Sequence, residues 1–263
     1  MKVQGKVVVV TGAGSGMGRQ LVLELVARGA KVAAVDMREE TLEETKSLAK
    51  GEVATFVADI TDADAVAALP AAITDALGQP DALINNAGII QPFVKVNDLD
   101  MASAHRVMNV NFTGPLMMVK AFIPGFLSRP EAHILNVSSM GAYAPVPGQS
   151  VYGASKAAVK LLTEGLRSEL LNTKVGVTVV FPGAIATNIA QNSGLEIPAD
   201  AAENSNQKTT PADVAARAMI DAIEQGKPRI TIGPDAKLMD RLSRLNPVFA
   251  ANLIYKQMAS LLG

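Results

Sequence analysis

The chain has 263 residues, of which 49% are hydrophobic and only 4% aromatic, and its formal net charge is −1. This balance argues against nucleic acid as a main partner, and the absence of cysteine excludes disulfides and thiolate metal sites. Two isolated histidines, His105 and His133, are too few for a metal cluster, so we expect structural roles for both and no bound metal. The early apolar run at residues 7–10 is too short for a signal peptide or a membrane span. We therefore expect a cytoplasmic protein without an integral membrane segment.

Short β-branched segments alternate with longer helical patterns along the chain, which is typical of βαβ units and a parallel sheet. Several of these strands are almost wholly apolar, so helices should cover both faces of the sheet. The sequence thus predicts one α/β domain with a doubly wound parallel sheet. The predicted strands are residues 6–10, 31–35, 53–57, 82–84, 133–137, 175–181 and 229–232. The predicted helices are residues 16–28, 39–49, 62–77, 101–127, 151–171 and 211–225.

A glycine-rich segment at residues 11–18 separates the first predicted strand from the first predicted helix. Its glycines, Gly12, Gly16 and Gly18 among them, permit a tight turn, close backbone approach to a pyrophosphate and close helix-to-strand packing. The free amides at the start of the helix add a partial positive charge. A plain strand–turn–helix connector is the alternative, but the context on both sides favours dinucleotide binding.

Asp36 ends the second predicted strand. A carboxylate there can accept hydrogen bonds from both ribose hydroxyls of an adenosine and would repel a 2′-phosphate, which favours NAD over NADP. The neighbouring Arg38 could soften that exclusion, and a helix N-cap is the alternative role for Asp36. Asp59, after the third strand, is similarly placed for the adenine edge, although Asp also suits a turn or a cap before Asp62.

Residues 85–88, Asn-Asn-Ala-Gly, follow the fourth predicted strand. Asn tolerates left-handed backbone and bonds its own backbone, so this segment can be a turn that stiffens the end of the strand. It can also bring the backbone close to a cofactor at Gly88. The two roles are compatible.

Tyr152 and Lys156 stand four residues apart on a predicted helix and therefore share one face. An ammonium near a phenol lowers the tyrosine pKa from about 10, which gives a general acid/base near neutral pH. Because any exposed helix can carry such a pair by chance, the pair gains weight from Ser139 upstream and from the glycine-rich segment. Together they predict redox chemistry on an alcohol or a carbonyl.

These motifs together resemble the short-chain dehydrogenase/reductase family, in its compact single-domain branch. The glycine segment, Asn-Asn-Ala-Gly, Asn111, the spacing of Ser139 and Tyr152, Tyr-x-x-x-Lys and the Pro-Gly at 182–183 fall in family order between residues 5 and about 190. The resemblance implies a Rossmann-type fold, hydride transfer to or from nicotinamide, and usually a homodimer or homotetramer. It also implies a single domain over residues 1–263, with a substrate loop at about 183–210.

The resemblance assigns the catalytic roles to four residues. Tyr152 would be the acid/base on the substrate oxygen, and Ser139 would donate a hydrogen bond to that oxygen. Lys156 would hold the nicotinamide ribose and polarise Tyr152, and Asn111 would support a water relay to Lys156. Successive strand residues face opposite sides of a sheet, so only one of Ser138 and Ser139 can face the site, and the family spacing selects Ser139.

A longer set would hold the cofactor. Within it, Thr187 would meet the carboxamide of nicotinamide. For the catalytic asparagine, the Phe-Thr-Gly that follows Asn111 selects Asn111 over Asn109. The full cofactor set implied by the resemblance is Gly12, Ser15, Gly16, Met17, Gly18, Asp36, Asp59, Ile60, Asn86, Ala87, Gly88, Tyr152, Lys156, Pro182, Gly183, Ile185 and Thr187.

The expected activity is NAD-dependent hydride transfer between nicotinamide and a secondary alcohol or ketone. The candidate walls of the substrate site are mostly apolar or amide and hold no Arg/Lys clamp, which favours a neutral, fairly hydrophobic substrate. An NADPH-dependent ketone or ketoacyl reductase is the first alternative, and a non-catalytic dinucleotide-binding sensor or scaffold is the second. The wall candidates are Gln91, Phe93, Met140, Tyr143, Gln149 and the substrate loop.

The C-terminal tail, residues 246–263, carries an apolar stripe at helical spacing. We expect it to pack on the chain's own domain or on a sister subunit. A lid over an apolar substrate and a contact with a membrane surface are the alternatives, and Lys256 alone is too little charge for the latter. The stripe is Phe249, Leu253, Ile254, Met258, Leu261 and Leu262.

Overall fold

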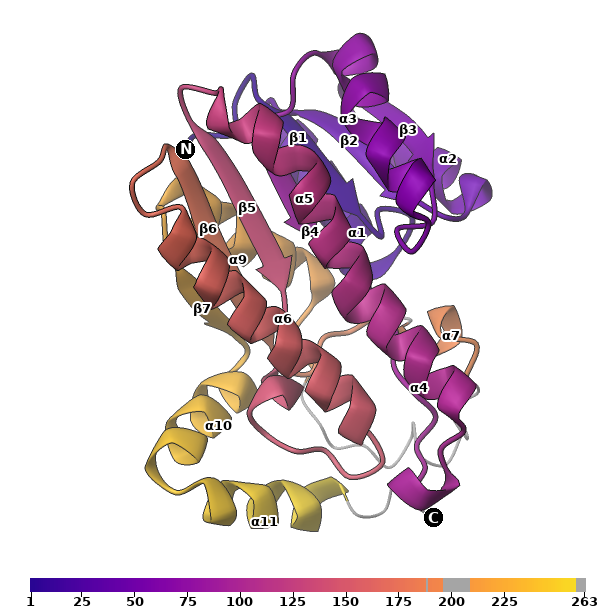
Figure 1. The fold of residues 1–263 in the computed structure, drawn as a ribbon, viewed down its shortest axis with the longest axis vertical. Helices are drawn as coiled ribbons and strands as arrows, with labels where there is room; N and C mark the ends of the chain where they lie inside the picture. The colour runs from indigo at the N-terminus through magenta and orange to yellow at the C-terminus, as the bar shows by residue number, and fades with distance from the viewer. Residues whose placement is uncertain (188, 196–208, 259–263) are drawn as a thin grey trace.

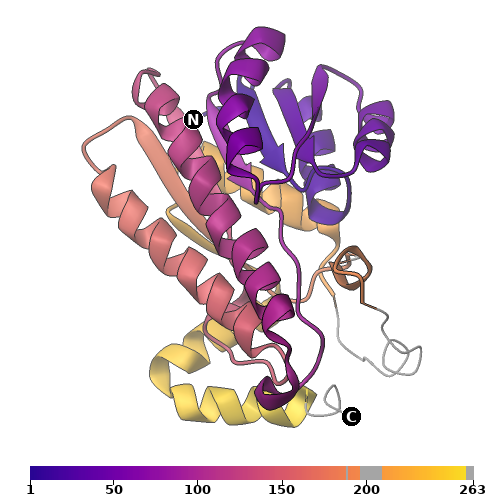
Figure 2. The same ribbon diagram turned by 45° about the vertical axis from the view of Figure 1, so that its right-hand side comes forward.

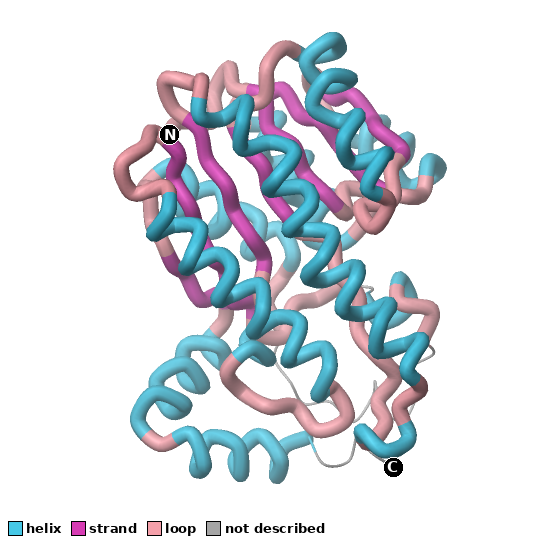
Figure 3. Tube along the Cα trace, in the orientation of Figure 1, coloured by secondary structure: helices cyan, strands magenta, loops and turns pink. Residues whose placement is uncertain are grey.

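Seven parallel strands form one sheet in the order β3-β2-β1-β4-β5-β6-β7 (Figures 1 and 3). The computed structural model describes residues 1–187, 189–195 and 209–258. Every strand lies within one residue of its predicted ends, so the doubly wound α/β architecture is confirmed. The strands are β1 (Val7–Thr11), β2 (Lys31–Asp36), β3 (Val53–Val57), β4 (Ala82–Asn85), β5 (Ala132–Val137), β6 (Val175–Pro182) and β7 (Arg229–Ile232).

The predicted helices are also present. The expected helix 101–127 is one continuous run with a π-helical turn, η2 (Asn109–Thr113), between α4 (Met101–Met108) and α5 (Gly114–Leu127). The others are α1 (Gly16–Ala27), α2 (Glu39–Leu48), α3 (Ala63–Leu77), α6 (Ser150–Glu169), α7 (Ile189–Asn192), α9 (Ala212–Glu224), α10 (Pro234–Leu245) and α11 (Pro247–Met258), with short 3₁₀ turns η1 (Val96–Asp98) and η3 (Met140–Ala142).

Helix α10 is absent from the predicted elements. Gly233-Pro234 suggests a loop after β7, yet proline suits the first position of a helix, where its missing N–H costs nothing. Its buried residues are only Ala236 and Met239, which is too narrow an apolar stripe to stand out in the sequence.

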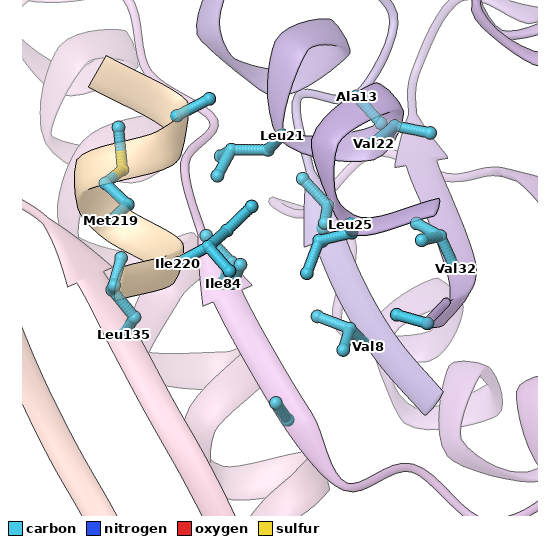
Figure 4. Close-up of a cluster of buried hydrophobic side chains, with 14 of the residues drawn as sticks. Val8, Ala13, Leu21, Val22, Leu25, Val32, Ile84, Leu135, Met219 and Ile220 are labelled. Carbon is cyan, nitrogen blue, oxygen red and sulfur yellow. The ribbon is translucent and has the colours of Figure 1, made fainter. Parts of the chain in front are cut away.

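Helices cover both faces of the sheet, as expected for strands with so few polar residues. Helices α1 and α9 cover one face, where Met219 and Ile220 lie near Ile84 and Leu135 (Figure 4). Helices α3, α5 and α6 lie on the opposite face (Figures 1 and 2). The two apolar layers hold the strands in place and leave their carboxyl ends free to form a site.

Within the described part of the chain, the run Met101–Leu127 is the one helix long and apolar enough to cross a membrane. Met118, Val119, Phe122 and Phe126 from this run are buried in the core between α3, α5 and the sheet. A core helix of a folded domain meets the same test of length and composition, and packing against the sheet accounts for this one.

His133 is buried in β5 and has a structural role. Its Nε2 lies 2.8 Å from the hydroxyl of Thr178, which in turn donates to the carbonyl of Lys227 at 2.6 Å. A Cβ on the adjacent Gly176 would lie only 2.5 Å from the His133 ring, so the neighbouring strand leaves room for the imidazole. Among the described residues no group of three or more potential ligands could hold a metal ion.

Acid should destabilise the fold through His133. Burial lowers its pKa from 6.5 to about 4, so the unfolded chain binds more protons between these values. The stability that the buried neutral imidazole contributes is fully present above pH 6.5. As the pH falls toward 4, the free energy of unfolding decreases by up to about 3 kcal/mol. Denaturant unfolding between pH 4 and 7 should show this loss in the wild type and a smaller one in His133→Gln. His105→Gln serves as the control, and equal pH dependence in all three proteins would contradict the assignment.

The C-terminal helices form a small separate core beside η3, at the carboxyl end of the sheet (Figures 1 and 2). In the tail stripe, Ile254 is buried there, and Leu253 and Met258 are partly buried against it. Phe249 is 54% exposed. The described tail therefore packs in part on its own domain, while Leu261 and Leu262 lie outside the described residues. The buried members of this small core are Met140, Ala144, Ala236, Met239, Ala250 and Ile254.

Candidate active site

A cleft of about 660 Å³ lies at the carboxyl ends of β1 to β4. The strand order reverses between β1 and β4, and in open α/β sheets ligands bind at such a switch point. Of the predicted cofactor set, the cleft is lined by Gly12, Ser15, Gly16, Met17, Asp36, Asp59, Ile60, Asn86, Ala87, Gly88 and Thr187. Its lining also includes Met37, Arg38, Thr61, Ala102, His105, Arg106, Asn109, Val110, Ile189 and Asn192.

The glycine segment folds so tightly that Gly12 and Gly18 leave no room for a side chain. Gly12 and Gly16 have positive φ values of 66° and 50°. A Cβ on Gly18 would lie 1.8 Å from the carbonyl oxygen of Gly12, and one on Gly12 would lie 2.9 Å from the Ala87 backbone. The amino end of α1 is therefore open to the cleft, which is the cradle that a pyrophosphate requires. The residues present fit a dinucleotide.

Asp36 lies at the mouth of this cradle, where its side chain is 9% exposed. Oδ2 accepts a hydrogen bond from the Gly14 amide at 3.0 Å, and Oδ1 accepts one from the Arg38 amide at 3.2 Å. The N-cap of α2 is Arg38, so the alternative N-cap role for Asp36 is wrong. The carboxylate both braces the glycine segment and faces the cleft.

Arg38 approaches the same carboxylate, with Nε 4.0 Å from Asp36 Oδ1. Its Nη2 donates to Asn192 of α7 at 3.2 Å, and Asn192 donates to the Ser15 hydroxyl at 2.9 Å. This chain of contacts joins α7 to the glycine segment across the cleft. Sequence spacing gives no sign of it, because Asn192 and Ser15 are 177 positions apart.

Asp59 stabilises a turn, which was the alternative to an adenine contact in the sequence analysis. Its Oδ1 accepts from both the amide and the hydroxyl of Thr61 at 2.8 Å. The residue is exposed and lines the cleft, so a contact with adenine stays a prediction. Asp62 is the N-cap of α3 and accepts from the Asp64 and Ala65 amides.

The Asn-Asn-Ala-Gly segment is fixed to the end of β1 by Thr11. The buried Thr11 hydroxyl accepts from the amides of Asn86 and Ala87 at 3.1 Å, and Asn86 Nδ2 donates to the Thr11 carbonyl. Asn85 Nδ2 donates to Asn136 of β5 at 2.9 Å. The segment therefore joins β1, β4 and β5 and also lines the cleft. Thr11 is an organising residue that the sequence interpretation missed.

Beyond Gly88 the cleft meets the predicted catalytic residues. A Cβ on Gly88 would lie 3.1 Å from Lys156 Nζ and 3.3 Å from Asn111 Oδ1, so only glycine keeps these groups accessible to the cleft. Lys156 Nζ is 5.9 Å from the centre of the Tyr152 ring and donates to the Val137 carbonyl at 3.1 Å. The four-residue step thus brings both side chains to one end of the site.

Ser138 and Asn109, the two residues set aside in favour of Ser139 and Asn111, make different contacts from those two. Ser138 is buried and donates its hydroxyl hydrogen to the Lys156 carbonyl at 2.7 Å, whereas the Ser139 hydroxyl accepts the Gly141 amide at 3.0 Å and lies close enough to Tyr152 to lower its pKa. Asn109 is exposed at the cleft, while the buried Asn111 holds the backbone of Ile89 through both its amide atoms. Ser138 and Ser139 follow the end of β5, and Asn109 and Asn111 stand two residues apart on a helical turn, so the two side chains of each pair point in different directions.

Burial sets the pKa values of the catalytic pair. It raises the pKa of Tyr152, and the hydrogen bond from Ser139 only partly opposes this. The expectation of a net lowered Tyr152 pKa is therefore not met, because desolvation of the phenolate dominates. Burial also lowers the pKa of Lys156 from 10.5 to about 8.

The depressed Lys156 pKa predicts a stability that rises with pH. The unfolded chain binds more protons between pH 8 and 10.5, so the cost of the buried ammonium is present below pH 8 and disappears across this interval. Relative to Lys156→Met, the wild type should gain up to about 3 kcal/mol of unfolding free energy over that range. Denaturant titrations at pH 7.5, 9 and 10.5 measure it, with Lys160→Met as the control on the same helix. Parallel curves for wild type and Lys156→Met would contradict the burial effect.

Gln91 anchors the amino end of α6, the helix that carries Tyr152. Its Oε1 accepts from the amides of Val151 at 2.8 Å and Tyr152 at 3.0 Å, and its carbonyl accepts from Gln149 Nε2 at 2.8 Å. Gln91 is fully buried and Gln149 is 4% exposed. The prediction of Gln91 as a substrate wall is therefore wrong, since its amide is used in holding the catalytic helix. Gln149 keeps a buried Oε1 without a hydrogen-bond partner among the described residues and lines a second pocket of about 340 Å³ with Tyr143, so its wall role stays a prediction.

The other wall candidates among the described residues are Tyr143, Met140 and Phe93. Tyr143 packs on Phe181 and donates its hydroxyl to the Ala236 carbonyl at 3.0 Å, so it faces α10. Burial raises its pKa. Met140 is buried in the small C-terminal core, and Phe93 is half-buried. Half of the substrate loop, residues 188 and 196–208, lies outside the described residues.

Three residues of the predicted cofactor set, at the end of β6 and just after it, do not line the cleft. Pro182 ends the strand, Gly183 lies beside Asp235, and the Ile185 side chain packs on the core under α1 and α9. Gly18 likewise lies behind the cleft, where it permits close packing of α1. Any contact of these residues with a cofactor would go through the backbone.

The sequence profile described as short chain dehydrogenase matches residues 6–197. A Mycobacterium tuberculosis protein named as an oxidoreductase, SadH, is 34% identical over 258 residues, which is 92% of this chain and 91% of the relative. A Burkholderia cenocepacia short chain dehydrogenase solved with NADP is 30% identical, with a TM-score of 0.82 over 97% of this chain and 99% of its own. A Burkholderia phymatum short chain dehydrogenase/reductase solved with NAD is 29% identical, with a TM-score of 0.83 over 94% and 98%. The chain therefore belongs to the short-chain dehydrogenase/reductase family of oxidoreductases.

Proposed function

We propose that this oxidoreductase uses NAD to move a hydride between its cofactor and a secondary alcohol or ketone that is neutral and fairly hydrophobic. The observation that carries the proposal is that Gly88 lines the cleft that holds the glycine segment and Asp36, while Lys156 Nζ lies 3.1 Å from where a Gly88 Cβ would be. The Tyr152 ring lies beside the same ammonium, and Ser139 lies next to Tyr152. Cleft and catalytic residues meet at Gly88.

The cofactor would be held at three places. The amino end of α1 and the glycine segment would bind the pyrophosphate, and Asp36 would accept from the adenosine ribose. Thr187 and the buried Lys156 would hold the nicotinamide half. The bound dinucleotide supplies the hydride chemistry, and the chain supplies orientation and the proton.

Tyr152 would exchange that proton with the substrate oxygen. Because burial raises its pKa, the hydroxyl stays protonated near neutral pH in the free protein, ready to donate to a carbonyl oxygen. Ser139 would hydrogen-bond to the same oxygen and stabilise its developing charge. Lys156 Nζ and Asn111 Oδ1 lie 3.1 and 3.3 Å from where a Gly88 Cβ would be, and a water between them would join the two in a proton path.

The choice of NAD rests on Asp36, whose carboxylate would repel a 2′-phosphate. The two solved relatives differ, since one is a complex with NADP and the other a complex with NAD. Arg38, 4.0 Å from Asp36, is the feature that favours an NADPH-dependent reductase as the second candidate. A non-catalytic sensor would have no use for a buried tyrosine beside Ser139 and a buried lysine.

Absorbance at the nicotinamide band tests the proposal, with NAD or NADP and a panel of secondary alcohols and the matching ketones. We expect turnover with NAD and small or no turnover with NADP. Turnover confined to NADPH and ketones would favour the second candidate. Cofactor binding without turnover on any member of the panel would favour the sensor.

We further propose that residues 1–263 act as one domain in a cytoplasmic homodimer or homotetramer. The single sheet, with the C-terminal helices packed beside η3, supports the first part. Light scattering of the purified protein measures the assembly, and a monomer at micromolar concentration would contradict that part of the proposal.

A further inference from the structure

Asp235, in the first turn of α10, reaches back to the segment that leaves β6. Its Oδ2 accepts the Ala184 amide at 2.7 Å. Three backbone bonds hold the same segment. The Gly183 amide donates to Ile232 at 2.9 Å, the Ala186 amide donates to Thr210 at 3.0 Å, and the Ala184 carbonyl accepts the Thr210 amide at 2.8 Å. In the described part of the chain, Asp235 is thus the one side chain that hydrogen-bonds to residues 183–187.

Two glycines make room for this carboxylate. A Cβ on Gly183 would lie 2.1 Å from Asp235 Oδ1, and one on Gly233 would lie 2.4 Å from it. Oδ1 is itself buried, with no hydrogen-bond partner among the described residues. An acidic residue that only complemented the dipole of α10 could point into solvent and would need no such space. The position of Asp235 is therefore set by the segment after β6.

That segment leads directly to the cofactor cleft. Thr187, three residues after Ala184, lines the cleft, and its Cβ would lie 3.3 Å from a Cβ on Gly16. We propose that Asp235 is a positioning residue that fixes residues 183–187 so that Thr187 meets the nicotinamide half of the cofactor. The inference rests on the proposed function and adds to it a residue outside the predicted cofactor set.

The same turn of α10 also contacts the catalytic side of the site. The carbonyl of Ala236, next to Asp235, accepts the Tyr143 hydroxyl at 3.0 Å, and Tyr143 lies between Ser139 and Tyr152 in the chain. One helical turn thus ties the segment before Thr187 to the segment after Ser139. This explains why the C-terminal helices pack at the site rather than on a face of the sheet.

Binding of NADH and of ADP-ribose to Asp235→Ala tests the proposal by calorimetry. ADP-ribose shares the adenosine and pyrophosphate contacts but lacks nicotinamide. Asp235→Ala should weaken NADH by roughly tenfold, the lower end of what a charge-assisted hydrogen bond contributes, and leave ADP-ribose within about twofold. Asp235→Asn keeps an acceptor for the Ala184 amide and should retain most of the NADH affinity.

Asp240→Ala is the matched control. Asp240 lies on the same helix and pairs with Arg229 and Arg244, but it does not contact residues 183–187. Its loss should lower the unfolding temperature without changing the ratio of NADH to ADP-ribose affinity. Gly183→Ala should displace the intact Asp235 carboxylate and weaken NADH binding as Asp235→Ala does. The double variant should bind NADH only slightly more weakly than either single variant, because both changes remove the same interaction with the Ala184 amide.

Equal weakening of both ligands in Asp235→Ala, or no weakening of either, would overturn the positioning role. If that variant does not fold, the same comparison in Gly183→Ala decides, with the same two outcomes. A wild-type protein that binds neither NADH nor ADP-ribose would instead refute the proposed function, and the positioning role with it.

Discussion

Replacing Tyr152 by Phe should lower kcat by about 10²–10⁴-fold, the range typical of a general acid/base. The change removes one hydroxyl from a buried ring and leaves the helix cap from Gln91 in place, because that cap uses the Tyr152 amide. Steady-state kinetics with the best substrate pair measures the effect. NADH affinity should stay near the wild-type value, since Lys156 and the glycine segment are untouched.

Tyr255→Phe is the control for this substitution, because Tyr255 is 58% exposed on α11 and its loss should leave kcat unchanged. A Tyr152→Phe variant that kept more than about a tenth of wild-type kcat would fall outside the range for proton transfer. The acid/base role would then have to pass to another group.

Replacing Asp36 by Ala should weaken NAD by at least about tenfold and improve NADP binding. The carboxylate is both a charged acceptor for the ribose and a repulsive charge for a 2′-phosphate, and a charge-assisted hydrogen bond contributes roughly 1.5–3 kcal/mol. Its loss also frees the Gly14 amide, so the phosphate cradle should loosen as well. Titrations with both dinucleotides measure the two affinities.

Asp36→Asn separates these two effects. An amide oxygen can still accept from Gly14, but the charge is gone, so NADP should improve while the cradle stays braced. Arg38→Ala is the companion variant and should weaken NADP in the Asp36→Asn background if Arg38 approaches the 2′-phosphate. An unchanged preference between NAD and NADP in both Asp36 variants would refute the role of Asp36 in cofactor choice.

Local sequence determined the elements and the motifs. Strands of Val, Ile and Ala between glycine- and asparagine-rich turns predict the parallel sheet, because buried strands need apolar residues on both faces. The glycine segment is also local, since Gly12 and Gly16 adopt positive φ within one turn. The period of the helix places Tyr152 and Lys156 on one face for the same reason.

Contacts between residues distant in the chain were decided only by the tertiary structure. Gln91 caps α6 from about sixty positions away, and the sequence suggested instead that its amide lines a substrate wall. Asp235 reaches Ala184 from 51 positions away and lies in a helix that the sequence did not reveal. An amide or a carboxylate has the same composition whether it meets a substrate, a helix end or a loop, so only the fold assigns its partner.

Burial is the other quantity that only the fold supplies. The spacing of Tyr152 and Lys156 suggested a lowered tyrosine pKa, because charge attraction depends on proximity, which spacing gives. The structure raises that pKa and lowers that of Lys156, because desolvation depends on all the chain packed around the pair. The sequence therefore determined that Tyr152 and Lys156 share one face of a helix, and the tertiary structure decided how strongly each holds its proton.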